Sequence, residues 1–199
     1  MFLKDVSTIR TGLVTSRKEA KGNPAAAYRL LGLRCIADDG TLDPESATPF
    51  YSGEPLKEEF LTQMNDVLVR LSAPYSAALI NEQRLCGLAV PSHYAIIRTD
   101  VSRVCPAYIL WILRSEATRK SIAMNTSGGG VLATINSSFF GEIQVPDIPL
   151  KRQHAIGQFT LLGEREQQLL QKLSVQKSLL HKIINKQIFD HLQRSCEVK

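Results

Sequence analysis

The side chains with useful chemistry gather in four short polar stretches, and none of these stretches forms a catalytic pattern. Arg and Lys suit phosphate oxygens and guanine edges, Asn suits adenine, and hydroxyl groups can contact either. The four stretches are therefore candidates for contacts with the phosphates and base edges of DNA, although each alone could be an ordinary surface loop. The candidate residues are Arg17, Lys18, Lys21, Ser72, Tyr75, Ser76, Ser92, His93, Tyr94, Asn125, Thr126 and Ser127.

Signatures of catalysis and of metal binding are missing from the sequence. No G-x-G-x-x-G, P-loop, G-x-S-x-G or H-E-x-x-H pattern occurs, and no Asn-Pro-Pro-aromatic motif for methylating bases. The four cysteines are widely spaced and have no histidine at ligand spacing, so we expect free thiols, no metal site and no cofactor. A glycine triplet at 128–130 predicts a hinge, because no lysine follows it to bind a phosphate. We expect a protein that is not an enzyme, with an unrecognised enzyme class as an alternative.

The positive charge is confined to the C-terminal quarter of the chain. Residues 1–150 hold 15 Lys or Arg and 15 Asp or Glu, whereas residues 151–199 hold 9 and 4. The net charge of +5 therefore falls wholly on the second segment, which favours an anionic partner or a solvated basic helix face. The sequence has no apolar run long enough for a membrane span and no signal-peptide layout at its start. We expect a cytoplasmic protein.

The candidate side chains must be positioned by a mixed body in residues 1–150. Strand patterns cover 66–71, 77–80 and 94–98, a helical period runs over 106–124, and the proline-rich stretch 41–55 should be irregular. No strict alternation of strands and helices appears, so a doubly wound nucleotide fold is not indicated. The predicted class is α+β, with a loop-rich domain followed by a long helix.

Residues 151–199 form the second predicted domain, most of it a single helix of the coiled-coil type. A continuous helix over 151–192 would span roughly 60 Å. Heptad assignment gives an apolar stripe that is wider than the seam of a two-stranded coiled coil. The helix therefore needs a partner to cover the stripe. The predicted interface residues are Leu162, Leu169, Leu173, Leu180, Ile183 and Ile184.

Four segments, spread over nearly the whole chain, carry a family likeness. They are LKDVSTIRTG at 3–12, MNDVLVR at 64–70, ATINSSFFGEIQVP at 133–146, and PLKRQHAI at 149–156, which leads into the long helix with QKL at 171–173. In these segments the sequence resembles the specificity subunit of type I restriction–modification systems. The joint at 143–156 is the most specific part of the likeness.

The resemblance implies two target-recognition domains, each followed by a long helix, with the two helices packed antiparallel. This chain departs from that layout, because it has one such domain and one such helix. Either it is a truncated relic, or two copies assemble what a full subunit makes in one chain. The uncovered stripe favours a homodimer that reads an interrupted palindrome in double-stranded DNA.

The resemblance further implies partners. Specificity subunits bind modification subunits, which carry the S-adenosylmethionine site and methylate adenine, and a restriction subunit joins to cut. The DNA-contacting residues of the family vary with the target, so none is carried over to this sequence. The alternative is a truncated, non-catalytic scaffold that dimerises and binds modification subunits without DNA selectivity.

Overall fold

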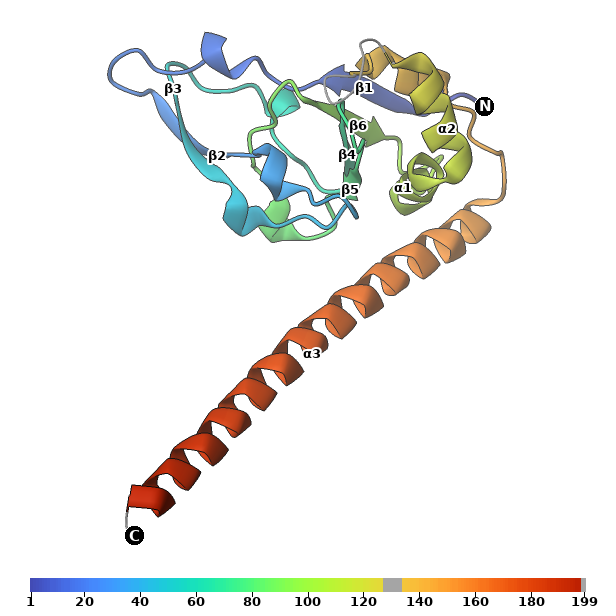
Figure 1. Ribbon diagram of the computed structural model, residues 1–199. Helices are drawn as coiled ribbons and strands as arrows, with labels where there is room; N and C mark the ends of the chain where they lie inside the picture. The colour runs from blue at the N-terminus through green and yellow to red at the C-terminus, as the bar shows by residue number, and fades with distance from the viewer. Residues whose placement is uncertain (127–133, 198–199) are drawn as a thin grey trace. The chain divides into compact units, whose positions relative to one another are not determined.

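The computed structural model describes residues 1–126 and 134–197, with the side chains of the C-terminal helix described as far as residue 189 (Figure 1). The strands are β1 (Ser7–Thr11), β2 (Ala26–Leu30), β3 (Thr48–Ser52), β4 (Asp66–Arg70), β5 (Ala77–Leu79) and β6 (Tyr94–Thr99). The α-helices are α1 (Pro106–Arg114), α2 (Glu116–Asn125) and α3 (Leu150–Glu197). Short 3-10 helices cover Leu3–Asp5, Thr15–Arg17, Leu33–Cys35, Pro44–Ser46, Glu58–Phe60, Gln83–Leu85 and Ser137–Glu142. The predicted α+β class with a long C-terminal helix is confirmed.

The chain divides into two compact units, Met1–Gln158 and Phe159–Lys199. The first unit holds the described strands, α1, α2 and the first two turns of α3, and the second unit holds the rest of α3. The beginning of α3 is therefore part of the folded body. The predicted functional division between residues 150 and 151 stays a prediction.

The first unit is built on a four-stranded antiparallel sheet with the order β1-β6-β4-β5. In the central pair, Val67 lies opposite Ile97 and Leu68 opposite Ile96. These four side chains are at most 1% exposed, so both faces of the central strands are covered. Side chains alternate between the faces of a strand, which explains why the sequence of β4 is apolar at successive positions.

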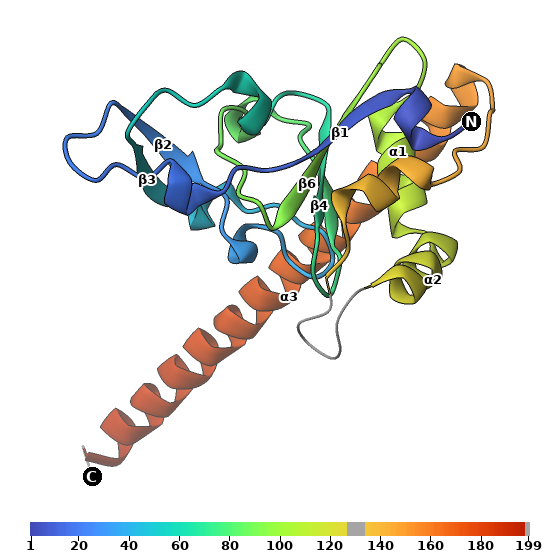
Figure 2. The same ribbon diagram turned by 90° about the horizontal axis from the view of Figure 1, so that it is seen from above.

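A two-stranded ribbon of β2 and β3 lies on one side of the central sheet, with α1 and α2 on the other side (Figures 1 and 2). A small core of Leu13, Phe50, Leu56 and Ala89 packs beneath the ribbon. It joins the ribbon to the chain that leads into β6.

Residues 41–55 are not wholly irregular as predicted, because β3 runs through them. Pro49 lacks an N–H group, but it lies in a two-stranded ribbon, where a proline is tolerated on the side that faces away from the partner strand. The proline content of the stretch therefore hid a strand.

The predicted helix over 106–124 is two helices, because Ser115 interrupts it. Ser115 has extended backbone angles, φ −62° and ψ 151°, and it ends α1 and caps α2 at once. Its hydroxyl accepts a hydrogen bond from the Thr118 N–H at 3.2 Å. Such a cap supplies one of the partners that the first turn of a helix lacks, so a new helix begins at Glu116.

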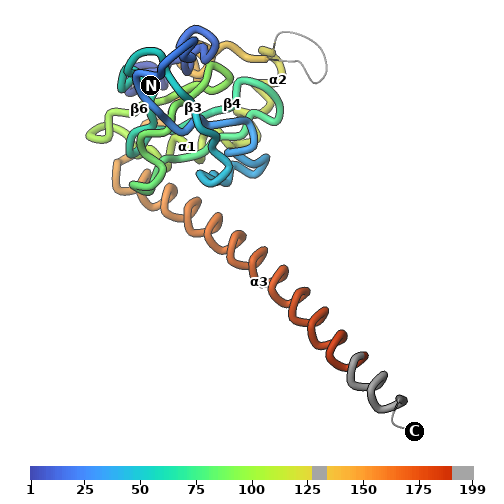
Figure 3. Tube along the Cα trace, turned by 90° about the vertical axis from the view of Figure 1, so that its left-hand side faces the viewer, coloured from blue at the N-terminus to red at the C-terminus, as the bar shows by residue number. Residues whose placement is uncertain are grey.

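In the second unit, the described residues 159–197 form a single continuous stretch of helix (Figure 3). Its predicted interface residues are between 42% and 67% exposed, and further large apolar side chains, such as Phe159 at 79%, are exposed as well. A helix with this much exposed apolar surface is typical of an interaction surface.

Candidate nucleic-acid interface

Loops that are far apart in the sequence meet at one end of the central sheet. Arg70, the last residue of β4, lies opposite Tyr94, the first residue of β6. The loops 71–76 and 91–93 therefore leave the sheet at the same end, where the Leu71 N–H donates to the His93 carbonyl at 2.9 Å. We call this end, with residues 71–76 and 91–93, the sheet-end site.

A tight turn forms the tip of the sheet-end site. The Tyr75 N–H donates to the Ser72 carbonyl at 2.9 Å, and the peptide bond between Ala73 and Pro74 is cis. A cis proline at the third position is the mark of a type VI turn. The Arg70 guanidinium donates from Nη2 to the Ala73 carbonyl at 3.0 Å, so the end of β4 holds the turn from below.

His93 packs beside this turn and is half-buried. Burial lowers the pKa of His93, the positive charge of Arg70 lowers it further, and a hydrogen bond with the Leu31 backbone opposes both. Its ring lies 4.7 Å from the ring of Tyr94. Within the described residues, neither His93 Nε2 nor Arg70 Nε has a hydrogen-bond partner, although both atoms are buried. Two nitrogen atoms at this site thus have hydrogen-bonding capacity that the described residues do not use.

The predicted residues at this end of the sheet fall into two groups, one partly exposed and one buried. Ser72, Tyr75, Ser92 and His93 are partly exposed and lie together at the sheet-end site.

Tyr94 and Ser76 are corrections, because both side chains are buried and cannot reach DNA in this fold. Tyr94 is 0% exposed, its hydroxyl donates to the Gly32 carbonyl at 3.0 Å, and burial raises its pKa. Ser76 is 6% exposed and its hydroxyl donates to the Asp38 carbonyl at 3.4 Å. Both residues support the site from within the domain.

Arg17, Lys18 and Lys21 lie on a separate loop beside the β2–β3 ribbon. The Gly53 N–H donates to the Lys18 carbonyl at 3.0 Å, which ties the loop to the ribbon. The Lys18 ammonium pairs with Glu54, and that hydrogen bond lowers the pKa of the carboxyl group. Among the described residues, Arg17 and Lys21 have no ion-pair partner and are exposed. They remain available to an anionic ligand.

An open hollow of about 350 Å³ lies next to this basic loop. It is lined by Glu19, Ala20, Gly22, Pro24, Pro49, Phe50 and Tyr51. The Tyr51 side chain is 55% exposed, so an aromatic ring borders the basic loop. Tyr51 is not among the residues predicted from the sequence, although the aromatic pair Phe50-Tyr51 within a proline-rich stretch is a signal that indicates it.

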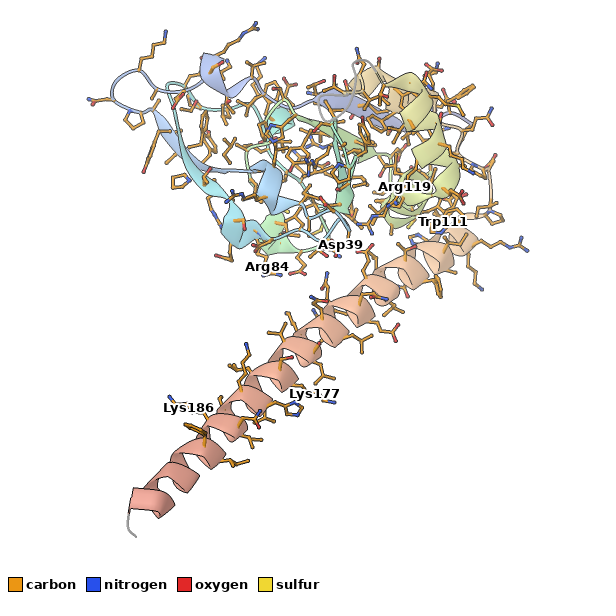
Figure 4. The ribbon with its side chains drawn as sticks, viewed as in Figure 1. Asp39, Arg84, Trp111, Arg119, Lys177 and Lys186 are labelled. Carbon is orange, nitrogen blue, oxygen red and sulfur yellow. The ribbon has the colours of Figure 1, made fainter. Side chains whose placement is uncertain are left out.

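A second hollow, of about 360 Å³, lies beside β2 and carries two arginines, Arg29 and Arg84. Both already pair with carboxylates, Arg84 with Glu82 at 2.6 Å and Arg29 with Glu45 at 3.9 Å. Figure 4 shows Arg84 on the surface of the first unit. The charge of each arginine is thus partly neutralised, so this hollow is a weaker candidate for binding an anion than the basic loop.

The remaining candidates lie at the end of α2. The Asn125 side chain donates to the Ser121 carbonyl at 2.8 Å, and the Thr126 hydroxyl donates to the Ala123 carbonyl at 3.2 Å. Both side chains thus bond back to their own helix, and Ser127 lies outside the described residues. No contact brings this group to the basic loop, so the predicted residues that the structure describes occupy three places rather than one surface patch.

The described residues contain no group of three or more His, Cys, Asp or Glu side chains that could hold a metal ion. Within the same part of the chain, no helix is both long enough and apolar enough to cross a membrane.

Comparison with known proteins finds relatives at the level of the fold. No protein-family model matches the sequence, and no curated protein does so. The HsdS subunit from Thermoanaerobacter tengcongensis matches with a TM-score of 0.61 and 15% identity, over 85% of this chain and 43% of that one. The S subunit of a type I restriction–modification system from M. genitalium matches with a TM-score of 0.53 and 13% identity, over 85% and 40%.

A third solved chain comes from work on complex assembly and conformational transition of the type I R-M system. It matches with a TM-score of 0.58 and 18% identity, over 89% of this chain and 40% of that one. At these identities the likeness shows a common fold. The chain spans about two-fifths of the length of each of these structures.

Proposed function

From the fold that this chain shares with type I restriction–modification specificity subunits, we propose that it is a DNA-recognition subunit of such a system. The observation that carries the proposal is the extent of the match, which covers 85–89% of the chain and includes both the mixed domain and the helix. In this role the chain is not an enzyme. It selects the DNA sequence on which other subunits act, and we place it in the cytoplasm.

The working form in this proposal is a homodimer. The chain spans about two-fifths of its structural neighbours, so two copies approximate one of them in length. The exposed apolar stripe on α3 supplies a surface for a second copy, and antiparallel pairing of two helices is compatible with a two-fold axis. Two identical domains then read two inverted half-sites, which makes the target an interrupted palindrome.

Within each domain, the sheet-end site is the better candidate for reading bases. Ser72 and Tyr75 offer hydroxyl groups on a turn that the sheet holds in place, and His93 offers an imidazole group on the neighbouring loop. The basic loop with Arg17, Lys18 and Lys21 is the better candidate for phosphate contacts, because flexible cations suit the backbone of DNA. Asn125, Thr126 and Ser127 remain candidates at the end of α2.

The partners follow from the same role. A specificity subunit without catalytic groups must recruit modification subunits, which methylate adenine using S-adenosylmethionine, and a restriction subunit can join them. The stripe on α3 is wider than one partner helix covers, which leaves room for a modification subunit beside the second copy.

The second candidate function is a scaffold that dimerises and docks modification subunits without DNA selectivity. The exposed stripe on α3 favours docking whether or not the domain reads sequence. Competition binding separates the two functions. A recognition subunit keeps a preferred duplex when unrelated duplex is added, whereas a scaffold binds all duplexes alike and releases them as salt rises.

The solution mass, measured by light scattering at several concentrations, tests the assembly. The proposal expects twice the 22.1 kDa of one chain. A monomer at every concentration would overturn the homodimer and would leave the stripe to a different protein.

A further inference from the structure

We propose that Gln153 and Gly157 are positioning residues that fix the root of α3 on the domain and so set the spacing between the two half-sites. The inference rests on the proposed function. It assigns a role to two residues that make no contact with DNA in that function. We call the contact made by Gln153 and Gly157 on the first turn of α1 the root contact.

Gln153 is a buried polar side chain with both ends of its amide satisfied. It is 2% exposed. Its Oε1 accepts a hydrogen bond from the Cys105 N–H at 2.9 Å, and its Nε2 donates to the Ile148 carbonyl at 2.9 Å. Cys105 precedes α1 and supplies no side-chain cap of its own. The glutamine therefore ties the start of α1 to the start of α3.

Gly157 lies four residues after Gln153 and thus on the same face of α3. A Cβ atom at this glycine would lie 2.7 Å from the Ala107 Cβ and 3.2 Å from the Tyr108 backbone nitrogen. Real Cβ atoms do not approach other atoms at 2.7 Å, so glycine allows α3 to pack directly on the backbone of α1. Close packing of this kind resists rotation and sliding of one helix on the other.

The segment that leads into α3 is held as well. The Tyr108 hydroxyl donates to the Pro146 carbonyl at 3.3 Å, and the Tyr108 ring stacks on Trp111 with centroids 5.8 Å apart. On the other side, the Val145 N–H donates to the Met1 carbonyl at 2.8 Å. The approach to α3 therefore has contacts from both α1 and the N-terminus.

The same helix offers a matched control for Gly157. Gly163, six residues further along α3, has nothing within 4 Å of an added Cβ. An added Cβ should therefore clash at Gly157 and be tolerated at Gly163. In a dimer that pairs through α3, the distance between the two domains depends on how firmly each helix is rooted. A firm root gives a single spacing, and a loose root gives several.

The test compares Gly157→Ala with the matched control Gly163→Ala and with the double variant Gly157→Ala/Ala107→Gly, which removes the clashing methyl group. The probe is a set of duplexes with fixed half-sites, taken from selection with the wild-type protein, and spacers of varied length. Amide hydrogen exchange over residues 150–158 and the solution mass are measured on the same proteins.

We expect the wild type and Gly163→Ala to prefer one spacer, and Gly157→Ala to lose that preference, with faster exchange at the root but an unchanged dimer. The double variant should regain the single spacer. A purely structural role for Gly157 would lower affinity for all spacers equally and would overturn the inference. Gln153→Met keeps the side-chain volume but removes both hydrogen bonds, and it provides a second test if Gly157→Ala does not fold.

Failure of the inference differs visibly from failure of the proposed function. If Gly157→Ala and Gln153→Met keep the single spacer, the root contact does not set the spacing, although DNA recognition stands. If the wild type itself shows no spacer preference, the proposed function fails and the inference fails with it.

Discussion

The Arg98 guanidinium donates two parallel hydrogen bonds to the Asp66 carboxylate, from Nε to Oδ1 at 2.7 Å and from Nη2 to Oδ2 at 2.8 Å. The Asp66 side chain is completely buried, and it also accepts from the Gln63 N–H at 2.8 Å. The hydrogen bonding of Arg98 with Asp66 raises the pKa of the Arg98 guanidinium. The two residues lie opposite each other on β4 and β6, at the end of the sheet remote from the sheet-end site. The pair therefore anchors the strands that carry the candidate turn.

Asp66→Ala should lower the free energy of unfolding by about 3 kcal/mol, because it leaves the Arg98 charge without its partner. Urea unfolding followed by circular dichroism measures the loss. The matched control is Glu142→Gln, which breaks the exposed pair with Lys4 and should change stability little. Equal losses in the two variants would mean that the buried pair contributes no more to the free energy of unfolding than the exposed pair.

The sequence alone was sufficient for the parts of the fold that depend on local pattern. The apolar runs at 66–71 and 94–98 predicted the central strands, and the heptad pattern predicted α3. A continuous apolar run indicates a strand that is covered on both faces, and a regularly repeated apolar position indicates a helix, so both elements leave a signal in the sequence. The break at Ser115 was missed because a serine inside a helical pattern is compatible with either one helix or two until its cap is seen.

The candidate site was harder to predict, because exposure is set by tertiary packing. Tyr94 has the chemistry of a contact residue, but it begins a central strand and points into the core. Arg70 was not a candidate, since its role under the Ser72–Tyr75 turn depends on a loop that folds back over it. Residue type and spacing indicated correctly that the loops are polar. They did not distinguish an exposed side chain from a buried one that makes hydrogen bonds within the domain.

The half-buried His93 should make stability depend on pH. Its folded pKa is lowered by burial and by Arg70, so the unfolded chain binds the proton more readily. The stability should therefore fall as pH drops below the unfolded value of about 6.5 toward the folded pKa, and it should be flat above that value for this group.

His93→Gln should reduce this slope, measured as the free energy of unfolding in urea at a series of pH values. His181→Gln, at an exposed position on α3, serves as the control and should keep the wild-type slope. A slope unaffected by the His93 change would show that other groups control the acid sensitivity. The charged group that faces His93 is Arg70, which itself pairs with Asp38 at 3.8 Å.

Leu173→Asp should abolish the dimer, since it would bury an unpaired charge in the helix pair at a cost of several kcal/mol, on the order of 3. Ser178→Asp adds the same charge about 140° further round the helix, outside the stripe, and should leave the dimer intact. Sedimentation velocity measures both. A dimer that survives the Leu173 change would mean that the interface lies elsewhere.

Substitutions in the basic loop and at the sheet-end site should have different effects on DNA binding. Arg17→Ala with Lys18→Ala should weaken binding to all duplexes alike and reduce the salt dependence by about one unit for each phosphate that the variant no longer binds. Tyr75→Ala should instead relax the preference at one position of each half-site. Fluorescence anisotropy with single-position variants of the target separates these outcomes, and the exposed Lys57→Ala serves as the control.

Selection of full-length protein on a randomised duplex library at low salt, followed by sequencing, tests the central claim most directly. The proposal predicts enrichment of two inverted half-sites separated by a spacer of one length. Enrichment of one half-site alone would contradict the homodimer. A pool that stays random after repeated rounds, with or without modification subunits, would contradict the proposal that this chain reads DNA sequence.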